Sequence, residues 1–260
     1  MTVPRPKFDT LGIFFAEAAT NHFFWDHHQT RQTVGTARLE QVLDYLANTM
    51  HFNVITYSSD NGYRNLDLVA KYFPTIQIGV TGEYPQMTPP KLPDVPARVI
   101  YLVDEPELRP FDPEILNDHV TRWQAQGHSV TINFCGLRRL RNDIAYAKAY
   151  LDRYQVDCAS IDLYPAYYDG TDWEFALGYL REIRPYVKGR FAAIIQGFGK
   201  PGVWRYPTIE EICRLAQACK DAGADELHFF LWNSIWTGDE LLTGLDVLPR
   251  EYHATIAEFR

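Results

Sequence analysis

Eight short apolar runs recur along the chain, and segments of helical periodicity separate them. Each run is rich in β-branched or aromatic residues, as expected for a strand that helices cover. The runs read LGIFFA (11–16), FNVITY (52–57), TIQIGV (75–80), RVIYLV (98–103), SVTINF (129–134), CASIDL (158–163), RFAAII (190–195) and ELHFFL (226–231). The alternation of strands and helices predicts a parallel sheet with right-handed crossovers, and eight strands close into a (β/α)8 barrel.

Capping and turn-forming residues mark where the intervening helices begin and end. Residues 37–50 carry apolar side chains on one stripe at helical spacing. The predicted helix starts are an N-cap Asp112 before Pro113 and two capping boxes, Thr171 with Glu174 and Thr208 with Glu211. The predicted helix ends are Gly127 and Gly223.

Two long connections depart from this pattern. Residues 17–36 follow the first run and have no regular periodicity, and residues 81–96 after the third run hold five prolines. A regular helix is not expected over 81–96, because proline removes a backbone donor and clashes with the preceding turn. Both connections lead from a strand into a helix, on the face where barrel enzymes keep their active sites. We expect them to form walls of a cleft, or simply to cover the barrel mouth.

The size and composition of the chain agree with one barrel domain over residues 1–260. The chain has 260 residues, close to the ~250 that this fold needs, and 46% of them are hydrophobic. Its net charge of −8 argues against nucleic-acid binding, which depends on Lys and Arg neutralising phosphates. The four cysteines show no CxxC spacing, so we expect reduced and packed thiols.

Targeting signals are not visible in the sequence as it stands. No apolar run approaches the ~20 residues of a membrane span, so no membrane association is expected. The segment MTVPRPKFDT has no apolar core of the kind that signal peptides carry. We therefore expect a cytoplasmic protein, with export by another route left open. The oligomeric state is not indicated by any pattern in the chain.

Acids, amides and aromatic residues collect where the predicted strands end, and Lys and Arg are absent from these positions. Carboxylates and amides accept and donate hydrogen bonds to sugar hydroxyls, and flat rings stack on sugar C–H faces, so this mixture predicts a carbohydrate ligand. Tyr167, shortly after the sixth run, is a further candidate for stacking. The strand-end candidates are Glu17, Tyr57, Asp104, Glu105, Asn133, Asp162, Tyr164, Gln196, Trp232 and Asn233.

Asp104 and Glu105 end the fourth run as a pair of adjacent acids. Pro106 is expected to restrict Glu105 to extended conformations. Two close carboxyl groups disfavour joint ionisation, so the pKa of one should rise, and a raised carboxyl suits a general acid. The alternative is that the acids only favour a short turn before the next helix, although Asp112 already supplies that helix with a cap.

Four motifs together resemble the barrel domains of glycoside hydrolases. They are YLVDEPEL at strand four, IDLYPAYY at strand six, AIIQGFG at strand seven and FFLWNS at strand eight. The chain is most similar to glycosidase-like bacterial proteins with Asp-Glu-Pro at strand four and Asp-x-Tyr-Pro at strand six. This resemblance implies a glycoside hydrolase with a strand-four acid/base. In the cellulase and β-galactosidase clan the partner is a Glu at the end of strand seven, where this chain has Gln196.

Two mechanisms remain. The adjacent acids also resemble those of β-N-acetylhexosaminidases, which implies that Asp104 orients the acetamido group of the substrate and that Glu105 acts as acid, then base. In that scheme Tyr164 would bond the acetamide and Trp232 would form a pocket floor. The second mechanism pairs Glu105 with Asp162, since strands four and six lie roughly 9–10 Å apart. Such a pair can reach either the retaining or the inverting separation.

Two other classes of function stay open. One is a carbohydrate-binding barrel without catalysis, and the other is a metal-dependent sugar isomerase or lyase with Glu17, Glu105 and Asp162 as oxygen ligands. Histidines at 22, 27 and 28 lie in the first connection, but the His-x-His of amidohydrolase barrels is missing at strand one. We therefore expect neither a metal nor a cofactor.

Overall fold

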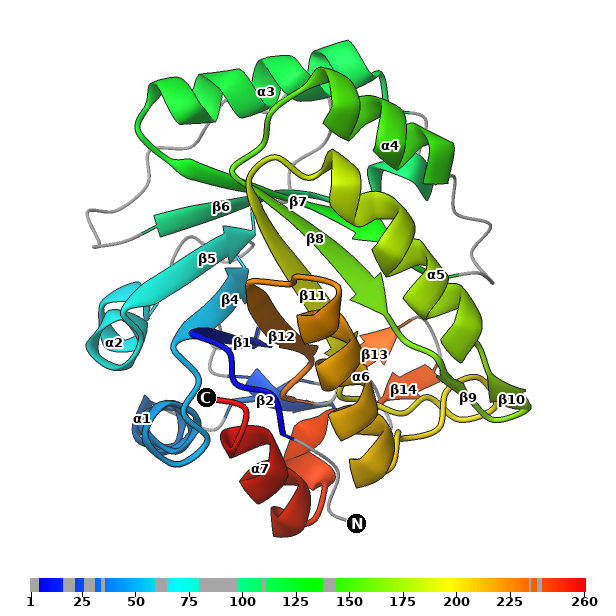
Figure 1. Ribbon diagram of the computed structural model, residues 1–260. Helices are drawn as coiled ribbons and strands as arrows, with labels where there is room; N and C mark the ends of the chain where they lie inside the picture. Colours follow the sequence, from blue (N-terminus) through cyan, green and yellow to red (C-terminus); the bar gives the residue numbers. More distant parts are fainter. Residues whose placement is uncertain are drawn as a thin grey trace.

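The chain folds into a closed barrel of eight parallel strands, as the sequence predicts (Figure 1). The computed structural model describes residues 5–15, 22–25, 31–33, 36–58, 65–79, 98–108, 111–137, 144–233, 235–237 and 240–260. Around the barrel the strands pair in chain order, with β12 returning to β1. They are β1 (Thr10–Phe14), β4 (Val54–Ser58), β5 (Thr75–Gly79), β6 (Arg98–Asp104), β7 (Ser129–Cys135), β8 (Cys158–Leu163), β11 (Arg190–Gln196) and β12 (Glu226–Phe230).

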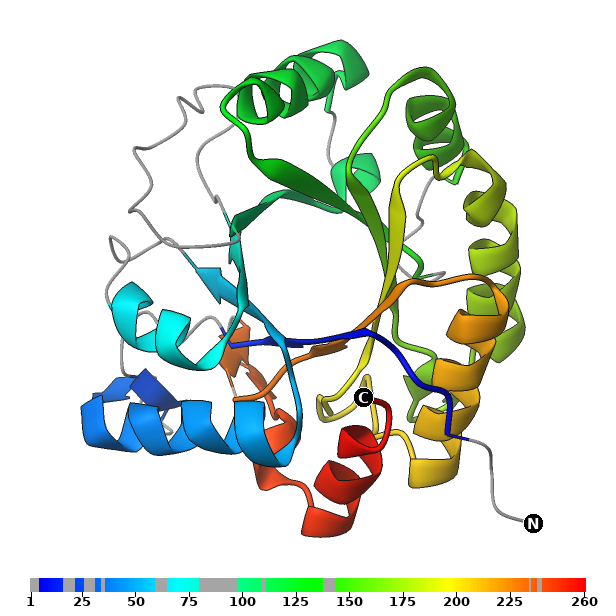
Figure 2. The same ribbon diagram turned by 60° about the vertical axis from the view of Figure 1, so that its left-hand side comes forward.

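Helices surround this ring of strands on its outer side (Figure 2). They are α1 (Thr36–Asp44), which continues as a π-helical turn over Tyr45–Thr49, α2 (Leu66–Tyr72), α3 (Pro113–Ala125), α4 (Ile144–Arg153), α5 (Trp173–Ile183), α6 (Ile209–Asp221) and α7 (Arg250–Ala257). Short 3-10 turns cover Pro106–Leu108, Arg184–Tyr186 and Leu245–Val247. Among the described residues, no helix is long and apolar enough to cross a membrane.

Most of the predicted helix boundaries are confirmed. The side chain of Asp112 accepts the backbone N–H of Glu114 at 2.8 Å, and the capping box of Thr208 makes both of its hydrogen bonds. Gly127 and Gly223 follow these two helices with φ of +80° and +81°, the left-handed conformation that glycine adopts without strain.

The capping box predicted at Thr171 is wrong. Helix α5 starts one residue later, with Asp172 at the N-cap position and no hydrogen bond from that side chain to the helix. Thr171 instead belongs to β10 (Gly170–Thr171), which pairs antiparallel with β9 (Ala166–Tyr167). The hairpin therefore takes the residue that the local pattern assigns to the helix.

The structure describes part of the first long connection, residues 17–36, and none of residues 81–96 in the second. The stretch 17–36 is not wholly irregular, because β2 (His22–Trp25) and β3 (Arg31–Thr33) form an antiparallel pair within it. A similar pair, β13 (Ile235–Thr237) and β14 (Glu240–Leu242), follows β12. The proline-rich segment 81–96 lies outside the described residues.

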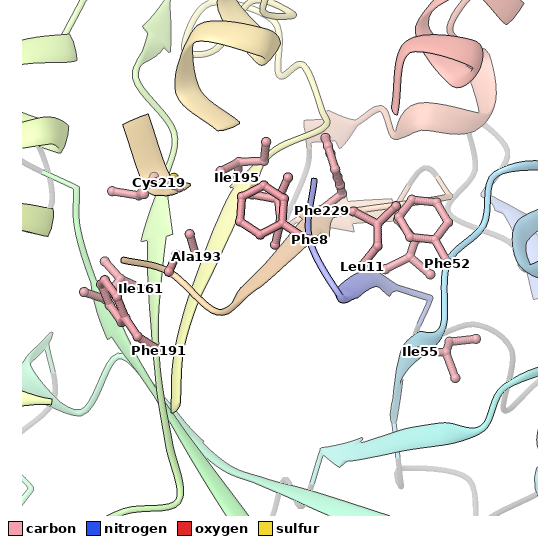
Figure 3. Packing of buried hydrophobic residues seen from close by; sticks show 14 of the residues in the cluster. Phe8, Leu11, Phe52, Ile55, Ile161, Phe191, Ala193, Ile195, Cys219 and Phe229 are labelled. Carbon is pink, nitrogen blue, oxygen red and sulfur yellow. The ribbon is translucent and has the colours of Figure 1, made fainter. Parts of the chain in front are cut away.

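The main apolar core fills the space between the strands and the helices. Figure 3 shows part of this layer, where Phe8, Phe52 and Phe229 are buried. The rings of Phe52 and Phe229 pack edge to face at 6.1 Å, and Phe259 stacks on Phe229 at 6.4 Å. The backbone N–H of Phe8 donates to the carbonyl of Phe259 at 2.7 Å, so the two ends of the barrel chain meet here.

The inside of the barrel is more polar than this outer layer. Thr56 of β4 donates to the Gln77 side chain of β5 at 2.7 Å, and Gln77 donates to Thr131 of β7 at 3.2 Å. Side chains inside the barrel therefore satisfy one another's hydrogen-bonding groups. On β12, the buried imidazole of His228 contacts the carboxylate of Glu226 at 2.9 Å. All four cysteines are buried and free, as predicted.

Candidate active site

A bulge in β6 turns the end of this strand toward the inside of the barrel. Tyr101 pairs with Thr131 of β7, but the next pairs are Val103 with Ile132 and Asp104 with Asn133, so β6 carries one extra residue. Because side chains alternate along a strand, an extra residue reverses the alternation beyond it. Tyr101 and Asp104 consequently lie on the same side, and the Tyr101 hydroxyl donates to Asp104 Oδ1 at 2.8 Å.

Asn133 holds Asp104 from the neighbouring strand. Its side-chain amide donates to Asp104 Oδ1 at 2.8 Å, and its carbonyl oxygen accepts from the Ser160 hydroxyl at 3.0 Å. Asn133 is fully buried, whereas Asp104 is exposed. Two protein donors therefore fix one oxygen of an otherwise accessible carboxylate.

Glu105 does not have the extended backbone that the following proline predicts. Its φ is +48°, in the left-handed region that residues other than glycine rarely adopt. Its N–H donates to the carbonyl of Asn133 at 2.9 Å, and its carbonyl accepts from the N–H of Leu108 at 3.1 Å. The turn that starts at Pro106 therefore overrides the local preference. Such strain commonly persists at functional sites, where the surrounding structure maintains it.

Asp162 is the buried carboxyl group of the site. It lies on β8 opposite Cys135 of β7, and its side chain is 6% exposed. Burial raises the pKa of Asp162 well above its ordinary value, and the charges of Asp104 and Glu105 raise it further. Hydrogen bonds from Tyr164 and Asn133 oppose this rise. No described residue donates to Asp162 Oδ1, which is also buried.

The influence of Asp104 and Glu105 on Asp162 shows that carboxyl groups from the fourth and sixth barrel strands come together. The same three acids raise the pKa of the Tyr101 and Tyr164 hydroxyls, after burial as the main cause. A buried acid with a raised pKa thus sits beside two further acids at the carboxyl ends of the strands. Environments that hold neighbouring carboxyl groups in different protonation states are typical of acid–base catalysis.

Glu107 is a fourth acid at this site, and the sequence interpretation missed it. Its Oε1 accepts the backbone N–H of Cys135, and its Oε2 is buried with no donor among the described residues. Burial raises the pKa of Glu107 to about 7, opposed by backbone hydrogen bonds and assisted by Glu105 and Asp104. Glu107 is the third acid of DEPEL, and this was the signal in the sequence that could have identified it. The 3-10 turn that begins at Pro106 brings its side chain back to β7.

Tyr164 lies in a group of aromatic rings at the barrel mouth. Its ring packs edge to face on Phe198 at 4.9 Å and stacks on Phe230 at 6.0 Å. Phe230 in turn contacts Phe14, whose ring meets that of Tyr101 at 5.6 Å. These rings surround the carboxyl groups with apolar atoms. Burial in such an environment raises the pKa of a carboxyl group.

Gln196 supports a loop with all of its polar atoms. Its side-chain carbonyl accepts from the N–H of Ala166, and its amide donates to the carbonyls of Ala166, Phe198 and Arg205 at 2.8–3.3 Å. The side chain is buried, and these bonds tie the segment after β8 to the segment after β11. The geometry thus favours a structural role for Gln196, and the predicted contact with substrate stays a prediction.

Of the other predicted binding residues, the structure describes the side chains of Trp232, Tyr167 and Asn233, and all three are buried. Trp232 packs on Tyr45 and His253 in the layer between strands and helices, at centroid distances of 6.1 and 5.4 Å. Tyr167 is buried against Trp204 at 5.9 Å, and Asn233 is also buried. Tyr168, the next residue after Tyr167, is exposed, with 60% of its surface accessible to solvent. Glu17 and the side chain of Tyr57 lie outside the described part of the chain.

Within the described residues, no group of three or more His, Cys, Asp and Glu side chains is arranged to hold a metal ion. Glu17, which the metal alternative invokes, and the side chains of the histidines in the first connection lie outside the described residues. The described acids are held by protein donors: Tyr101 and Asn133 bond Asp104.

Comparison with known structures supports the TIM-barrel fold. The GH53 catalytic domain of Ignisphaera aggregans aligns with 100% of this chain and 96% of its own, with a TM-score of 0.55 and 10% identity. An active-site mutant of Rhizomucor miehei β-1,3-glucanosyltransferase, in complex with laminaritriose, aligns with 85% of this chain and 86% of its own, with a TM-score of 0.52 and 12% identity. At these identities the likeness establishes the fold. Neither structure is described as a hexosaminidase, so that resemblance gains no support.

Comparison of the sequence itself with known families and proteins finds no relative. No protein-family profile matches the chain, and no curated protein matches it.

Proposed function

We propose that the protein cleaves or transfers glycosidic bonds with carboxyl groups from β6 and β8. The observation that carries this proposal is the burial of Asp162 beside Asp104 and Glu105, which raises the pKa of Asp162. Glycosidases that use two protein carboxyls need one as an acid for the leaving oxygen and one as a charged group at the sugar carbon. The shared fold of the two glycoside-processing structures agrees with this chemistry without specifying it.

The environments favour Asp162 as the acid. Its raised pKa favours the protonated form, which a general acid requires. This reverses the roles expected from the sequence, where Glu105 was the proton donor. Glu105, partly buried at the very end of β6, is then the charged carboxylate that attacks the anomeric carbon or activates a water molecule. Asp104 accepts a sugar hydroxyl with the oxygen that Tyr101 and Asn133 leave unoccupied.

The test is turnover of a glycoside panel by the wild type and the variants Asp162→Asn and Glu105→Gln. The panel contains β-1,3-glucan oligosaccharides, acetamido sugars, and aryl glycosides with good and poor leaving groups. Asp118→Asn, an exposed acid on α3, is the matched control. We expect kcat/KM on natural glycosides to fall by about 10²–10⁴-fold in each site variant, and to be unchanged in the control.

Leaving groups separate the two roles. A dinitrophenyl leaving group needs no protonation, so Asp162→Asn should retain most activity on that substrate, whereas Glu105→Gln should lose it. The opposite pattern would restore Glu105 as the acid. Cleavage confined to acetamido sugars would support the substrate-assisted mechanism. Absence of cleavage by the wild type across the panel would contradict the proposal, and retained sugar binding would then indicate a non-catalytic barrel.

A further inference from the structure

Glu107 extends the pairing between β6 and β7 beyond the point where β6 ends. The last backbone bond of this pair runs from the N–H of Glu105 to the carbonyl of Asn133. Two residues further along β7, the N–H of Cys135 donates to the Glu107 carboxyl instead. A side-chain oxygen thus takes the place of the backbone acceptor that the ladder would present next.

Cys135 contacts both acids that flank Pro106. Its N–H bonds Glu107, and its buried thiol lies against Glu105. Burial is the main cause that raises the pKa of this thiol, and the charge of Glu105 and a hydrogen bond to it add to the rise. The thiol therefore donates to the Glu105 carboxylate, while the backbone of the same residue anchors the turn that carries Glu105.

We propose that Glu107 is a positioning residue, which fixes the 3-10 turn against Cys135 and thereby aims the Glu105 carboxylate. The internal bond from Leu108 to Glu105, the bond from Glu105 to Asn133 and the packing of Pro106 also hold the turn. The left-handed backbone of Glu105 needs such an external restraint, because nothing local favours it. This inference rests on the proposed function, in which Glu105 reacts with the substrate.

The charges around Glu107 explain why a neutral acid suits this position. Burial of Glu107 and the charges of Glu105 and Asp104 disfavour a negative charge there, whereas the backbone hydrogen bond from Cys135 favours it. On α4, which packs against the turn, the ionisable side chains are Tyr146, Lys148, Tyr150, Asp152 and Arg153. Lys148 pairs with Glu182 and Arg153 with Glu114, so both cations are engaged elsewhere.

The test compares Glu107→Gln, which keeps a neutral acceptor, with Glu107→Leu, which removes it. We expect Glu107→Leu to lower kcat about 10–100-fold with KM within about twofold, as a misplaced reacting group does, and Glu107→Gln to retain wild-type kcat at pH 6. Glu251→Leu, an exposed site on α7, controls for the substitution. Equal kcat in the Leu variant, or equal losses in both variants, would overturn the proposal.

A second readout needs no turnover. Carbon-13 NMR of labelled glutamate carboxyls should show a group titrating near pH 7 that is absent from Glu107→Gln. The Glu105 carboxyl resonance should move in Glu107→Leu and stay in place in Glu107→Gln. If Glu107→Leu does not fold, Glu107→Ala removes the same acceptor without adding a bulky apolar side chain, and it should move the Glu105 resonance in the same way. An unmoved Glu105 resonance would refute the positioning role, whereas an inactive wild type would refute only the proposed function.

Discussion

Gly12 lies on β1 opposite His228 of β12, and its lack of a side chain makes room for the imidazole. A Cβ at position 12 would overlap the Nδ1, Cε1 and Cγ atoms of that ring. The ring is buried and bonded to Glu226, so it has no open space to move into. A glycine in a strand interior often marks such a close approach.

We therefore expect Gly12→Ala to lower the free energy of unfolding by about 1–3 kcal/mol, the usual cost of overpacking. Gly178→Ala is the control, because a Cβ there meets nothing within 4 Å, and α5 should gain up to about 1 kcal/mol. Denaturant unfolding of both variants measures the difference. Adding His228→Ala to Gly12→Ala should recover part of the loss. A Gly12→Ala protein as stable as the wild type would contradict the packing.

Single residues were also where local sequence rules failed. Pro106 predicts an extended Glu105, yet the residue has a φ of +48°. The rule describes what an isolated dipeptide prefers, at a cost of about 1–3 kcal/mol when it is violated. In the folded chain, the bond from Glu105 to Asn133 and the turn to Leu108 decide the conformation. The bond to Asn133 depends on β7, which the local sequence around Pro106 does not contain.

At the scale of elements, the capping box of α6 is the clearest case of a local signal that the structure obeys. The Thr208 hydroxyl accepts from the N–H of Glu211 at 3.2 Å, and the Glu211 carboxylate accepts from the N–H of Thr208 at 2.8 Å. Arg205 also donates to this carboxylate at 2.6 and 2.7 Å, and its hydrogen bond is the main cause that lowers the pKa of Glu211.

Thr208→Ala should lower the free energy of unfolding by about 1 kcal/mol, the usual effect of losing an N-cap. Thr208→Ser keeps the hydroxyl and should remain within a few tenths of the wild type. Thermal or denaturant unfolding of the three proteins is the measurement. Equal losses in both variants would mean that the methyl group, and not the cap, matters at this position.

The strand-end acids show what element boundaries can and cannot predict. Asp104 and Asp162 follow from the rule that parallel strands present their carboxyl ends at one edge, and the structure brings them together. The bulge in β6 and the return of Glu107 to Cys135 were not predictable, because both depend on the register between β6 and β7. Trp232 has a strand-end position too, yet packs toward the helices on Tyr45.

For the whole molecule, buried ionisable groups should make stability depend on pH in two opposite ways. Burial alone would raise the pKa of Glu226, but the hydrogen bond and charge of His228 and the charge of Arg190 outweigh it and lower the pKa. A lowered carboxyl pKa stabilises the fold above the ordinary value of about 4.5, and this contribution is lost as pH falls through the folded value. Asp162 and Glu107 act oppositely, because their raised pKa values favour the fold at low pH.

Unfolding free energies of the wild type and Glu226→Gln, measured between pH 3 and pH 6, test the first effect. The wild type should lose stability as the pH falls below about 4.5, and the variant should lose less over the same range. Glu251→Gln controls for the removal of one carboxyl group. If both variants have the slope of the wild type, Glu226 is not held in its ionised form by His228 and Arg190.

The sequence by itself determined the barrel, because periodicity along eight strands is a local property that repeats and that only a closed parallel sheet satisfies. It also determined which acids stand at the strand ends. Only the tertiary structure decided the pKa values of these acids and the orientation of their side chains. The pKa of Asp162 depends on burial by neighbouring strands, and the orientation of Glu105 depends on one extra residue in β6 and on a side chain that completes the ladder to β7. These are relations between strands distant in the sequence, and they form only when the barrel closes.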